Sequence, residues 1–349
     1  MMSSGIGLYI HVPFCTRKCP YCDFYSVEFN EPLADKYTAA VCDTMRRGGI
    51  LPPTVFDTVY FGGGTPSLLG ARRILRILSA IDTTDDAEIT IEANPASWTT
   101  GITQDLFELY EGGVNRISFG VQSLNDSELK ALGRLHTAKD AKRSITDAHT
   151  AGFRRISADI MLGIPEQTLE SLIISVDELA NLPLDHISAY ILTPDEDEEK
   201  AAEFYLAAVE RLANHGFEQY EISNFAKHGS VSRHNLKYWR CEPYLGIGPA
   251  AHSFYDGERF HYPNDLMAFI DAKNPLDLRV ADGAGGGFEE CAMLRLRLAE
   301  GFETDNAQML DRAKKLEAAG LVQTDGNIIR LTPRGFLFSN TVICEIIPQ

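Results

Sequence analysis

Three cysteines near the beginning of the chain, Cys15, Cys19 and Cys22, are close enough in sequence to act on one metal centre. Thiolates on one loop can bind three corners of a cubane iron–sulfur cluster, which leaves a fourth iron open to another ligand, as a reactive metal site requires. Zinc is one alternative, but it needs a fourth ligand, and the nearest candidate, His11, lies in a predicted strand. Buried free thiols are the other. The ligand count and the open position favour the cluster.

A run of three glycines follows a predicted strand, in Gly62-Gly63-Gly64-Thr65-Pro66. Consecutive glycines let a backbone approach a ligand closely and present N–H groups to a carboxylate, although a glycine run can also be only a tight turn. Further polar residues end the next two predicted strands: Glu92, Asn94 and Gln122. Because the carboxyl ends of parallel strands meet at one rim, we expect the cysteines, the glycines and these polar residues to lie together.

One carboxylate, Asp159, falls inside a predicted strand and can face the interior of a barrel. A carboxylate in that position is costly unless a cation or hydrogen-bond donors accompany it. Arg134 is a possible partner, or else a solvated surface arginine, and the sequence leaves both alternatives open.

The elements that position these residues alternate along the first 200 residues. Short runs rich in Ile, Val, Phe and Tyr predict strands at Leu8–Val12, Thr58–Phe61, Glu88–Glu92, Arg116–Val121, Arg155–Leu162 and His186–Leu192. Segments of helical character lie between or after them, at 32–47, 67–80, 103–111, 125–151, 168–181 and 197–214. Alternating strands and helices predict a parallel sheet, and six units are too few for a closed eight-fold barrel. We therefore expect an α/β fold, a partial (β/α)6 barrel with its site at the carboxyl ends of the strands.

Two further regions follow this barrel. Residues 201–284 are predicted to extend it, although 216–262 are aromatic, rich in glycine and difficult to assign. Residues 285–349 predict helices at 287–299 and 306–319, a hairpin through Val322–Leu331 that turns at Asp325-Gly326, and a last helix near Thr332. That order resembles a winged-helix module, so we expect three units: 1–200, 201–284 and 285–349.

The composition is that of an ordinary globular protein, with 44% hydrophobic and 23% charged residues among 349. The net charge of −17 disfavours nucleic acid and anionic lipid as partners. The apolar runs are shorter than the about 18 residues that a membrane span requires, and residues 1–4 have no signal-peptide character. Seven cysteines, an odd number, argue against a disulfide framework. We expect a cytoplasmic protein without a transmembrane segment.

The cysteine loop followed by Gly-Gly-Gly-Thr-Pro resembles the radical S-adenosylmethionine (SAM) superfamily. Within it, nearly the whole chain is similar to the oxygen-independent coproporphyrinogen III oxidase-like proteins. The similar segments are residues 9–15, 92–95, 119–123, 132–134, 159–165 and 220–225.

This resemblance implies a 4Fe–4S cluster on Cys15, Cys19 and Cys22, with the amino and carboxylate groups of SAM on the open iron. Cleavage of the sulfonium by the reduced cluster would release a deoxyadenosyl radical, and it needs an electron donor such as flavodoxin or ferredoxin. The resemblance also implies a set of residues beside the cluster and SAM: Tyr9, Tyr21, Gly63, Gly64, Thr65, Glu92, Gln122, Arg134 and Asp159.

Three features indicate the heme-chaperone branch of this family. The enzymes of the other branch carry a further cysteine where this chain has Phe24, and an N-terminal arm before the barrel, whereas the first predicted strand here begins at Leu8. The segment from Arg233 to Trp239 also matches the His-Asn-x-x-Tyr-Trp motif that is linked to heme binding in the chaperone branch. The resemblance thus implies heme-binding residues in that motif: His234, Asn235, Tyr238 and Trp239.

The chemistry of the motif allows two interpretations. Histidine is a common axial ligand of heme iron, and the two aromatic rings can stack on a macrocycle. Alternatively, the segment is a structural corner in which His234 satisfies backbone groups and the aromatic rings fill a core. Cys241 and His252 are nearby alternative ligands, and three other cysteines are expected to be core residues: Cys42, Cys291 and Cys344.

One departure from the family lies after the sixth strand, where Leu192-Thr193 runs directly into Pro194-Asp195-Glu196-Asp197 without the longer connection of the relatives.

Three functions for the protein then compete. The favoured one is a heme chaperone that passes heme to an acceptor protein, and the second is an oxygen-independent coproporphyrinogen III dehydrogenase. The third makes the C-terminal module an adaptor for nucleic acid or protein, against which the negative charge argues.

Overall fold

The computed structural model describes residues 5–46, 54–95, 97, 102–192 and 198–348. All six strands expected in the first 200 residues are present within one or a few residues of their predicted ends. All five pairs of successive strands form, and each is parallel. The strands are β1 Ile6–Val12, β4 Phe56–Gly63, β5 Thr83–Ala93, β6 Arg116–Gln122, β7 Arg155–Leu162 and β8 His186–Ile191.

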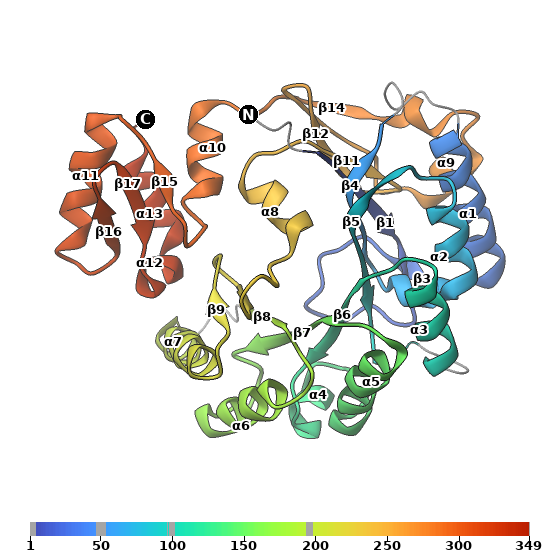
Figure 1. Cartoon of the computed structure of the whole chain (residues 1–349), viewed down its shortest axis with the longest axis horizontal. Helices are drawn as coiled ribbons and strands as arrows, with labels where there is room; N and C mark the ends of the chain where they lie inside the picture. The colour runs from blue at the N-terminus through green and yellow to red at the C-terminus, as the bar shows by residue number, and fades with distance from the viewer. Residues whose placement is uncertain (1–4, 47–53, 96, 98–101, 193–197, 349) are drawn as a thin grey trace.

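Helices cover the outer side of this sheet, as crossover connections between parallel strands require (Figure 1). The alternation of residues along each strand explains the two faces, because Leu8, Ile10 and Val12 of β1 join the core beneath the helices while Tyr9 lies on the other face. The helices are α1 Glu31–Arg46, α2 Gly70–Leu78, α3 Ile102–Glu111, α4 Asp126–Ala131, α5 Ala138–Ala151 and α6 Leu169–Ala180.

The prediction of a single helix over 125–151 is wrong, because the chain forms α4 and α5 with a break between them. Gly133 has a φ of 72°, in the left-handed region where a helix ends. Thr137 then begins α5 with a capping box, in which its side chain accepts from the N–H of Asp140 and the Asp140 side chain accepts from the N–H of Thr137.

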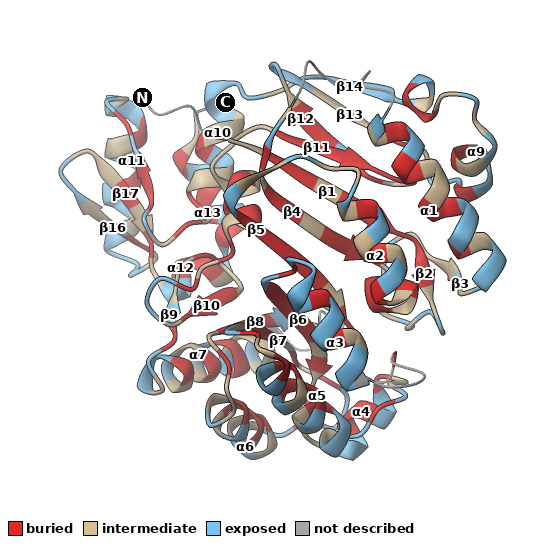
Figure 2. Cartoon of the chain, turned by 45° about the vertical axis from the view of Figure 1, so that its right-hand side comes forward, coloured by how far each residue is buried: buried red, intermediate tan, exposed pale blue. Residues whose placement is uncertain are grey.

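The segment that was difficult to assign extends the sheet at both edges. Its strand β11 (Tyr244–Ile247) pairs parallel with β1, which makes seven parallel strands in a row where six were expected. Antiparallel strands continue each edge: β9 Glu218–Gln219, β10 Asn224–Ala226, β12 His252–Tyr255, β13 Glu258–His261 and β14 Val280–Ala284. The complete order is β14-β13-β12-β11-β1-β4-β5-β6-β7-β8-β10-β9. Figure 2 shows the central strands buried and β14 exposed at its edge.

A short helix, α8 (Arg233–Trp239), lies on the inner side of the sheet (Figure 1). Ser232 caps it by accepting from the N–H of Asn235. Lys237 anchors it, because its buried Nζ donates to the carbonyl of Gly5 at 2.7 Å and lies 2.9 Å from Asp57 Oδ2. The ion pair therefore fixes α8 against the beginnings of β1 and β4.

The C-terminal residues form a three-stranded sheet with helices, in the order expected from sequence except for one additional strand, β15, and one additional helix. The hairpin turns at Asp325-Gly326, where Gly326 has a φ of 63°. Figure 1 shows this unit beside α7 (Glu198–Asn214), and a β-bridge joins Glu221 to Leu298 at the junction. Its elements are α10 Phe288–Arg295, β15 Phe302–Glu303, α11 Ala307–Glu317, β16 Val322–Asp325, β17 Ile328–Leu331, α12 Pro333–Leu337 and α13 Ser339–Ile346.

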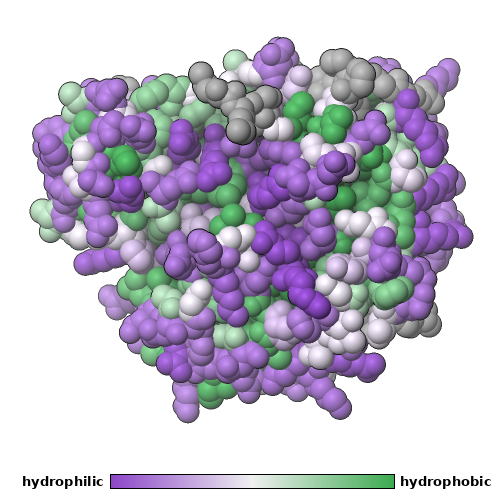
Figure 3. All heavy atoms as spheres, viewed as in Figure 1, coloured by the Kyte–Doolittle hydropathy of each residue, from purple (hydrophilic) through white to green (hydrophobic). Residues whose placement is uncertain are grey.

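Hydrophilic side chains predominate on the face seen in Figure 3, and hydrophobic ones form scattered patches among them. Among the residues that the structure describes, none of the helices has the length and apolar character to cross a membrane. The shortened connection noted in the sequence falls on residues 193–197, which lie outside the described residues.

Replacing Lys237 with methionine removes the ammonium group and leaves the half-buried Asp57 carboxylate without its cation. Breaking a buried ion pair on one side costs about 3–5 kcal/mol. We expect Lys237→Met to lower the free energy of unfolding by about 3 kcal/mol in denaturant titrations. The control is Lys315→Met, because its ion pair with Asp311 is exposed and should change stability by less than about 0.5 kcal/mol. Equal effects of the two substitutions would contradict the anchoring role of Lys237.

Candidate functional site

A row of polar side chains crosses the inner face of the sheet. Tyr9 on β1 and Tyr60 on β4 are register partners, and their rings stack with centroids 6.2 Å apart. The hydroxyl of Tyr60 donates to Glu92 Oε1 on β5 at 2.8 Å. Further along the row, Ser118 on β6 donates to Asp159 Oδ1 on β7 at 3.2 Å. The sheet register thus brings together five residues from five strands that the sequence separates by up to 150 positions.

The environment of the two carboxylates in this row disfavours their ionised forms. Burial raises the pKa of Glu92 to about 7, and the nearby charge of Asp159 adds to the rise, while the bonds from Tyr60 and Gly63 oppose it. Burial likewise raises the pKa of Asp159 to about 6, against the bonds from Ser188 and Ser118 and the charge of Arg116. A cationic amine or hydroxyl donors placed against these carboxylates would relieve that cost.

The cysteine loop begins where β1 ends. A short strand β2 (Phe14–Cys15) pairs with β3 (Val27–Glu28) and closes the loop at its base. The thiols of Cys15, Cys19 and Cys22 are free and half-exposed. Burial raises the pKa of the Cys22 thiol, and the nearby Cys15 and Cys19 raise it further. Three partly exposed thiols therefore lie on one loop, as a cluster-binding site requires.

The glycine run holds the end of β4 against this loop. Gly64 donates its N–H to the carbonyl of Val12 at 2.8 Å, and Thr65 donates to that of Phe14 at 2.7 Å. A Cβ at Gly64 would lie 2.6 Å from the Phe14 carbonyl oxygen, so only glycine fits. The expectation that these N–H groups face a ligand carboxylate is wrong in this conformation, since Gly63 also donates to a protein group, Glu92 Oε2, at 3.2 Å.

The sequence left two alternatives for Arg134, and the structure lies between them: Arg134 forms no direct ion pair with Asp159, although its charge lowers the pKa of that carboxyl, and its side chain is half-buried. One of its NH groups points at Cys19 Sγ, 3.7 Å away, and the other donates to the carbonyl of Gly120 at 2.7 Å. Its Nε is buried and has no partner. Arg134 thus places a positive charge directly beside the cysteine loop, where it suits an anionic cluster with thiolate ligands.

Two other predicted residues lie around Arg134. Gln122 ends β6 with a φ of 69°, unusual for a residue other than glycine, and its Nε2 lies beside Gly120 as Arg134 does. Tyr21 lies next to Cys19 and Arg134, and burial raises the pKa of its phenol to about 12. The Tyr21 hydroxyl is buried and faces Cys19 and Arg134. Together with the unpaired Nε of Arg134, it places polar groups beside the thiols, where a polar ligand can bind.

The zinc alternative required His11 as a fourth ligand. The Nε2 of His11 bonds the carbonyl of Tyr25 at 2.9 Å, and its Nδ1 bonds the hydroxyl of Tyr9 at 3.2 Å. Burial lowers the pKa of this imidazole. Both ring nitrogens are occupied, so His11 positions Tyr9 and in this conformation offers no free nitrogen to a metal.

His234 lies on the same inner face, completely buried, and stacks on Tyr60 with ring centroids 5.2 Å apart. Its Nδ1 bonds the Thr58 hydroxyl at 2.8 Å and its Nε2 bonds the Tyr238 hydroxyl at 2.7 Å. Burial lowers the pKa of this imidazole to about 3, so it is neutral. In this conformation both ring nitrogens are engaged, and iron ligation by His234 requires that one of these bonds open.

The other motif residues and cysteines are distributed around α8. Asn235, Tyr238 and Trp239 are half-buried, and the guanidinium of Arg297 lies over the Trp239 ring at 5.9 Å. Of the three cysteines expected in the core, only Cys42 is buried. Cys291 is half-exposed and Cys344 is exposed, because both lie on helices of the C-terminal unit that pack only one face.

Tyr60 was not singled out from sequence, although it holds Glu92 and contacts Tyr9 and His234. The sequence did contain a pattern that could have identified Tyr60. It alternates with the apolar Val59 and Phe61 in a predicted strand, so its side chain lies on the opposite face from theirs, and its register partner Tyr9 lies on that same face.

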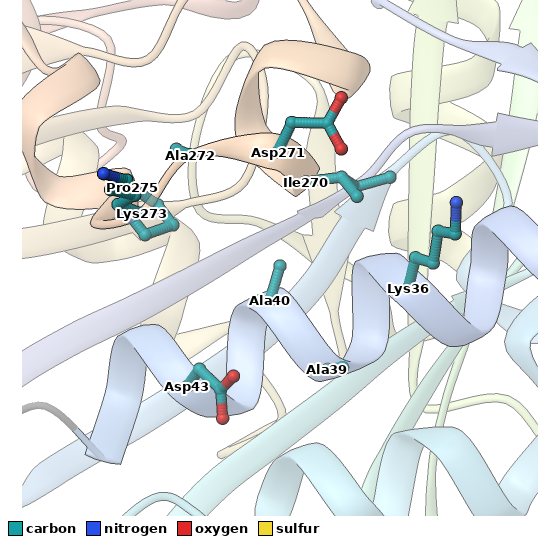
Figure 4. Close-up of a pocket in the computed structure, with 9 residues that line it drawn as sticks. All are labelled: Lys36, Ala39, Ala40, Asp43, Ile270, Asp271, Ala272, Lys273 and Pro275. Carbon is teal, nitrogen blue, oxygen red and sulfur yellow. The ribbon is translucent and has the colours of Figure 1, made fainter.

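A cavity of about 330 Å³ lies elsewhere, between α1 and the residues that follow α9 (Leu266–Asp271). Figure 4 shows its lining, which includes Lys36 and Asp43 of α1 and Pro275. It belongs to the outer side of the molecule and contains none of the residues of the candidate site.

The fold and the cysteine loop are those of a radical SAM protein. The family profile described as the Radical SAM superfamily matches residues 9–179, and that of the HemN C-terminal domain matches 288–338. The solved coproporphyrinogen III oxidase HemN of Escherichia coli has the same fold, with a TM-score of 0.82 at 20% identity over 99% of this chain and 90% of that one.

Curated relatives narrow the assignment. The chain is 33% identical to the heme chaperone HemW of Bacillus subtilis (strain 168), over 96% of this chain and 97% of that protein. It is 37% identical to the mitochondrial radical S-adenosyl methionine domain-containing protein 1 of Mus musculus, over 99% of this chain and 88% of that protein. The chain belongs to the HemW family of radical SAM proteins, which confirms the resemblance found in its sequence.

The raised pKa of Glu92 predicts a pH-dependent stability. Between its usual pKa of 4.5 and about 7, folded Glu92 keeps a proton that the unfolded chain has lost. Stability from this group therefore falls as the pH rises through that window, by about 3 kcal/mol in total. In protein without added SAM, Glu92→Gln should abolish this fall in the free energy of unfolding, which denaturant unfolding at several pH values measures. Exposed Asp85→Asn is the control, and an unchanged pH profile in Glu92→Gln would contradict the prediction.

Proposed function

We propose that this protein is a heme chaperone that carries a 4Fe–4S cluster with SAM and delivers heme to an acceptor protein. The observation that carries the proposal is the similarity to proteins named heme chaperone HemW over nearly the full length of both chains. Phe24 supports it, because this exposed side chain stands where the oxidase-type relatives have a further cysteine.

In this proposal, the thiolates of Cys15, Cys19 and Cys22 would hold three irons. The cluster, when bound, supplies one-electron reduction of SAM. Arg134 would stabilise the negative charge of the thiolate-bound cluster from its position beside Cys19.

The inner face of the sheet would orient SAM. The carboxylates of Glu92 and Asp159 suit an ammonium group and ribose hydroxyls, and the half-buried, stacked rings of Tyr9 and Tyr60 would limit the access of water to this end of the row. Gly63, Gly64, Thr65, Gln122 and Tyr21 would shape the rest of the site around the loop.

Substitution of the cysteines tests the cluster. After anaerobic reconstitution with iron and sulfide, we expect about four irons per chain and the brown chromophore of a 4Fe–4S cluster. Cys19→Ala should lose most of both, since two thiolates do not hold the cubane. Cys344→Ala is the control, because this thiol is exposed on α13 and outside the loop. Equal iron content in the two variants would exclude the loop as the cluster site.

For heme, we propose that α8 supplies the binding residues His234, Asn235, Tyr238 and Trp239. The segment offers a neutral imidazole and two half-buried aromatic rings within one short helix. Because the Tyr238 hydroxyl occupies Nε2 of His234, heme iron would have to displace that bond. Opening of α8 would then couple heme uptake to a rearrangement on the inner face of the sheet.

Two opposite substitutions test this arrangement in heme titrations followed in the Soret region. His234→Ala should weaken saturable binding of one heme per chain at least tenfold, a loss of about 1.4 kcal/mol or more. Tyr238→Phe should strengthen it, because it frees Nε2 of the imidazole while keeping the ring. His228→Ala is the control, since this histidine is exposed and outside α8. Heme binding that neither His234→Ala nor Tyr238→Phe alters would place the heme elsewhere.

We further propose a cytoplasmic location, and as partners a flavodoxin- or ferredoxin-like electron donor and a heme-accepting protein.

The oxidase activity of the structurally similar enzyme is the competing function. Anaerobic incubation of the reconstituted protein with coproporphyrinogen III should leave the propionates intact if the chaperone function is correct.

A further inference from the structure

Three potential metal ligands converge on the edge of the large sheet, away from the cysteine loop. His252 on β12, His261 on β13 and Asp282 on β14 each offer a ligand atom, and these atoms all lie within 4.8 Å of one another. His261 Nδ1 lies 2.7 Å from Asp282 Oδ1, and His252 Nδ1 lies 3.8 Å from Asp282 Oδ2.

The strand register fixes the two imidazoles. A two-residue turn at Asp256 and Gly257, with φ of 52° and 75°, connects β12 to β13 and sets His252 directly opposite His261. Residues that face each other in this way carry their side chains on the same side of the sheet. The two rings accordingly stack, with centroids 5.1 Å apart and an interplanar angle of 26°.

A β-bulge brings the carboxylate. Arg259 pairs with Gly283 and Phe260 pairs with Ala281, which leaves Asp282 as the extra residue between them. The φ of 118° at Gly283 accommodates this irregularity. Bulges redirect side chains, and this one directs Asp282 to the two imidazoles.

The spacing suits a small transition-metal ion. Tetrahedral Zn²⁺ with bonds of about 2.0–2.1 Å to nitrogen and oxygen needs its ligand atoms about 3.3 Å apart. The 2.7 Å and 3.8 Å separations bracket this value, so rotation of the side chains alone can meet it. Two imidazoles and one carboxylate are donors typical of zinc, cobalt, nickel or iron, whereas calcium and magnesium prefer oxygen alone.

The site is open and its charge is favourable. The side chains are partly exposed, with relative accessibilities of 66% for His252, 28% for His261 and 35% for Asp282. A positive charge that acts on His252 belongs to Arg259, which is paired with Glu290 and lies over the Phe254 ring. Three protein ligands leave at least one coordination position for water or an exogenous group.

The open position lies on the inner face of the sheet. Gly246 pairs with Tyr9, and the antiparallel pairing of Tyr244 with Phe254 carries the same face onto β12, where His252 lies two residues away from Phe254. His252 is thus two strands from Tyr9, or about 10 Å at the usual strand spacing. An occupant of this position would border the candidate SAM site.

We propose that His252, His261 and Asp282 bind a divalent first-row transition-metal ion, of which Zn²⁺ is the best match, with an open coordination position beside the candidate site. The ion would fasten the three edge strands β12, β13 and β14 to one another. This proposal does not depend on heme binding or on the chaperone function.

The test is a titration of the full-length protein, carrying its reconstituted cluster so that the loop thiols are occupied, with Co²⁺ and with Zn²⁺ under anaerobic conditions. We expect one ion per chain, with visible Co²⁺ d–d bands and without a thiolate-to-cobalt charge-transfer band. His252→Ala and Asp282→Asn should each weaken Zn²⁺ binding at least tenfold in a chelator competition, whereas exposed His228→Ala should leave it unchanged.

Several outcomes would overturn the proposal. They are the absence of stoichiometric binding, equal affinity in the wild-type protein and both variants, and a thiolate charge-transfer band, which would place the ion on cysteines such as Cys241 and Cys291. Asp282→Asn preserves the size of the side chain in the bulge, and circular dichroism of each variant shows whether a loss of binding comes from unfolding.

Discussion

The parallel pairing of β1 with β4 is the constraint on which the rest of the site depends. It brings the end of β1, from which the cysteine loop leaves, next to the glycine run that ends β4. Gly64 makes the contact possible, because any Cβ there would collide with the backbone of Phe14. The same pairing sets Tyr9 beside Tyr60 and thereby begins the polar row on the inner face. One register thus positions both the cysteine loop and the residues proposed to bind SAM.

Burial of polar groups on the inner face of the sheet costs free energy, and the packing of apolar residues on the outer face offsets that cost. Apolar residues of alternate positions pack under the helices and stabilise the sheet, while Glu92, Asp159 and His234 are held without full solvation on the other side. Such groups lower the stability of the folded protein, and a bound cation or polar ligand reduces this effect. Binding and folding are therefore coupled: the protein is expected to be most stable when its cofactors are in place.

The sequence predicted the local features well and the long-range contacts poorly. Short runs rich in Ile, Val, Phe and Tyr located six strands, and cysteine spacing located the loop, because both are local patterns. β11 was missed, since four residues in an aromatic, glycine-rich segment carry too little periodicity. The break before Thr137 was visible in its capping box, yet the helical pattern on both sides concealed it. The contact of Arg134 with Cys19 and that of His234 with Thr58 span more than 100 residues and follow only from the assembled sheet.

The central claim is that the cluster loop and the carboxylate row form one SAM site. Electron paramagnetic resonance of the reduced, reconstituted protein tests it most directly, because SAM bound to the open iron perturbs the cluster signal. Titration with SAM should change the wild-type spectrum saturably, and Glu92→Gln should require at least tenfold more SAM for the same change. A wild-type spectrum that SAM leaves unchanged, in protein with a complete cluster, would contradict the account.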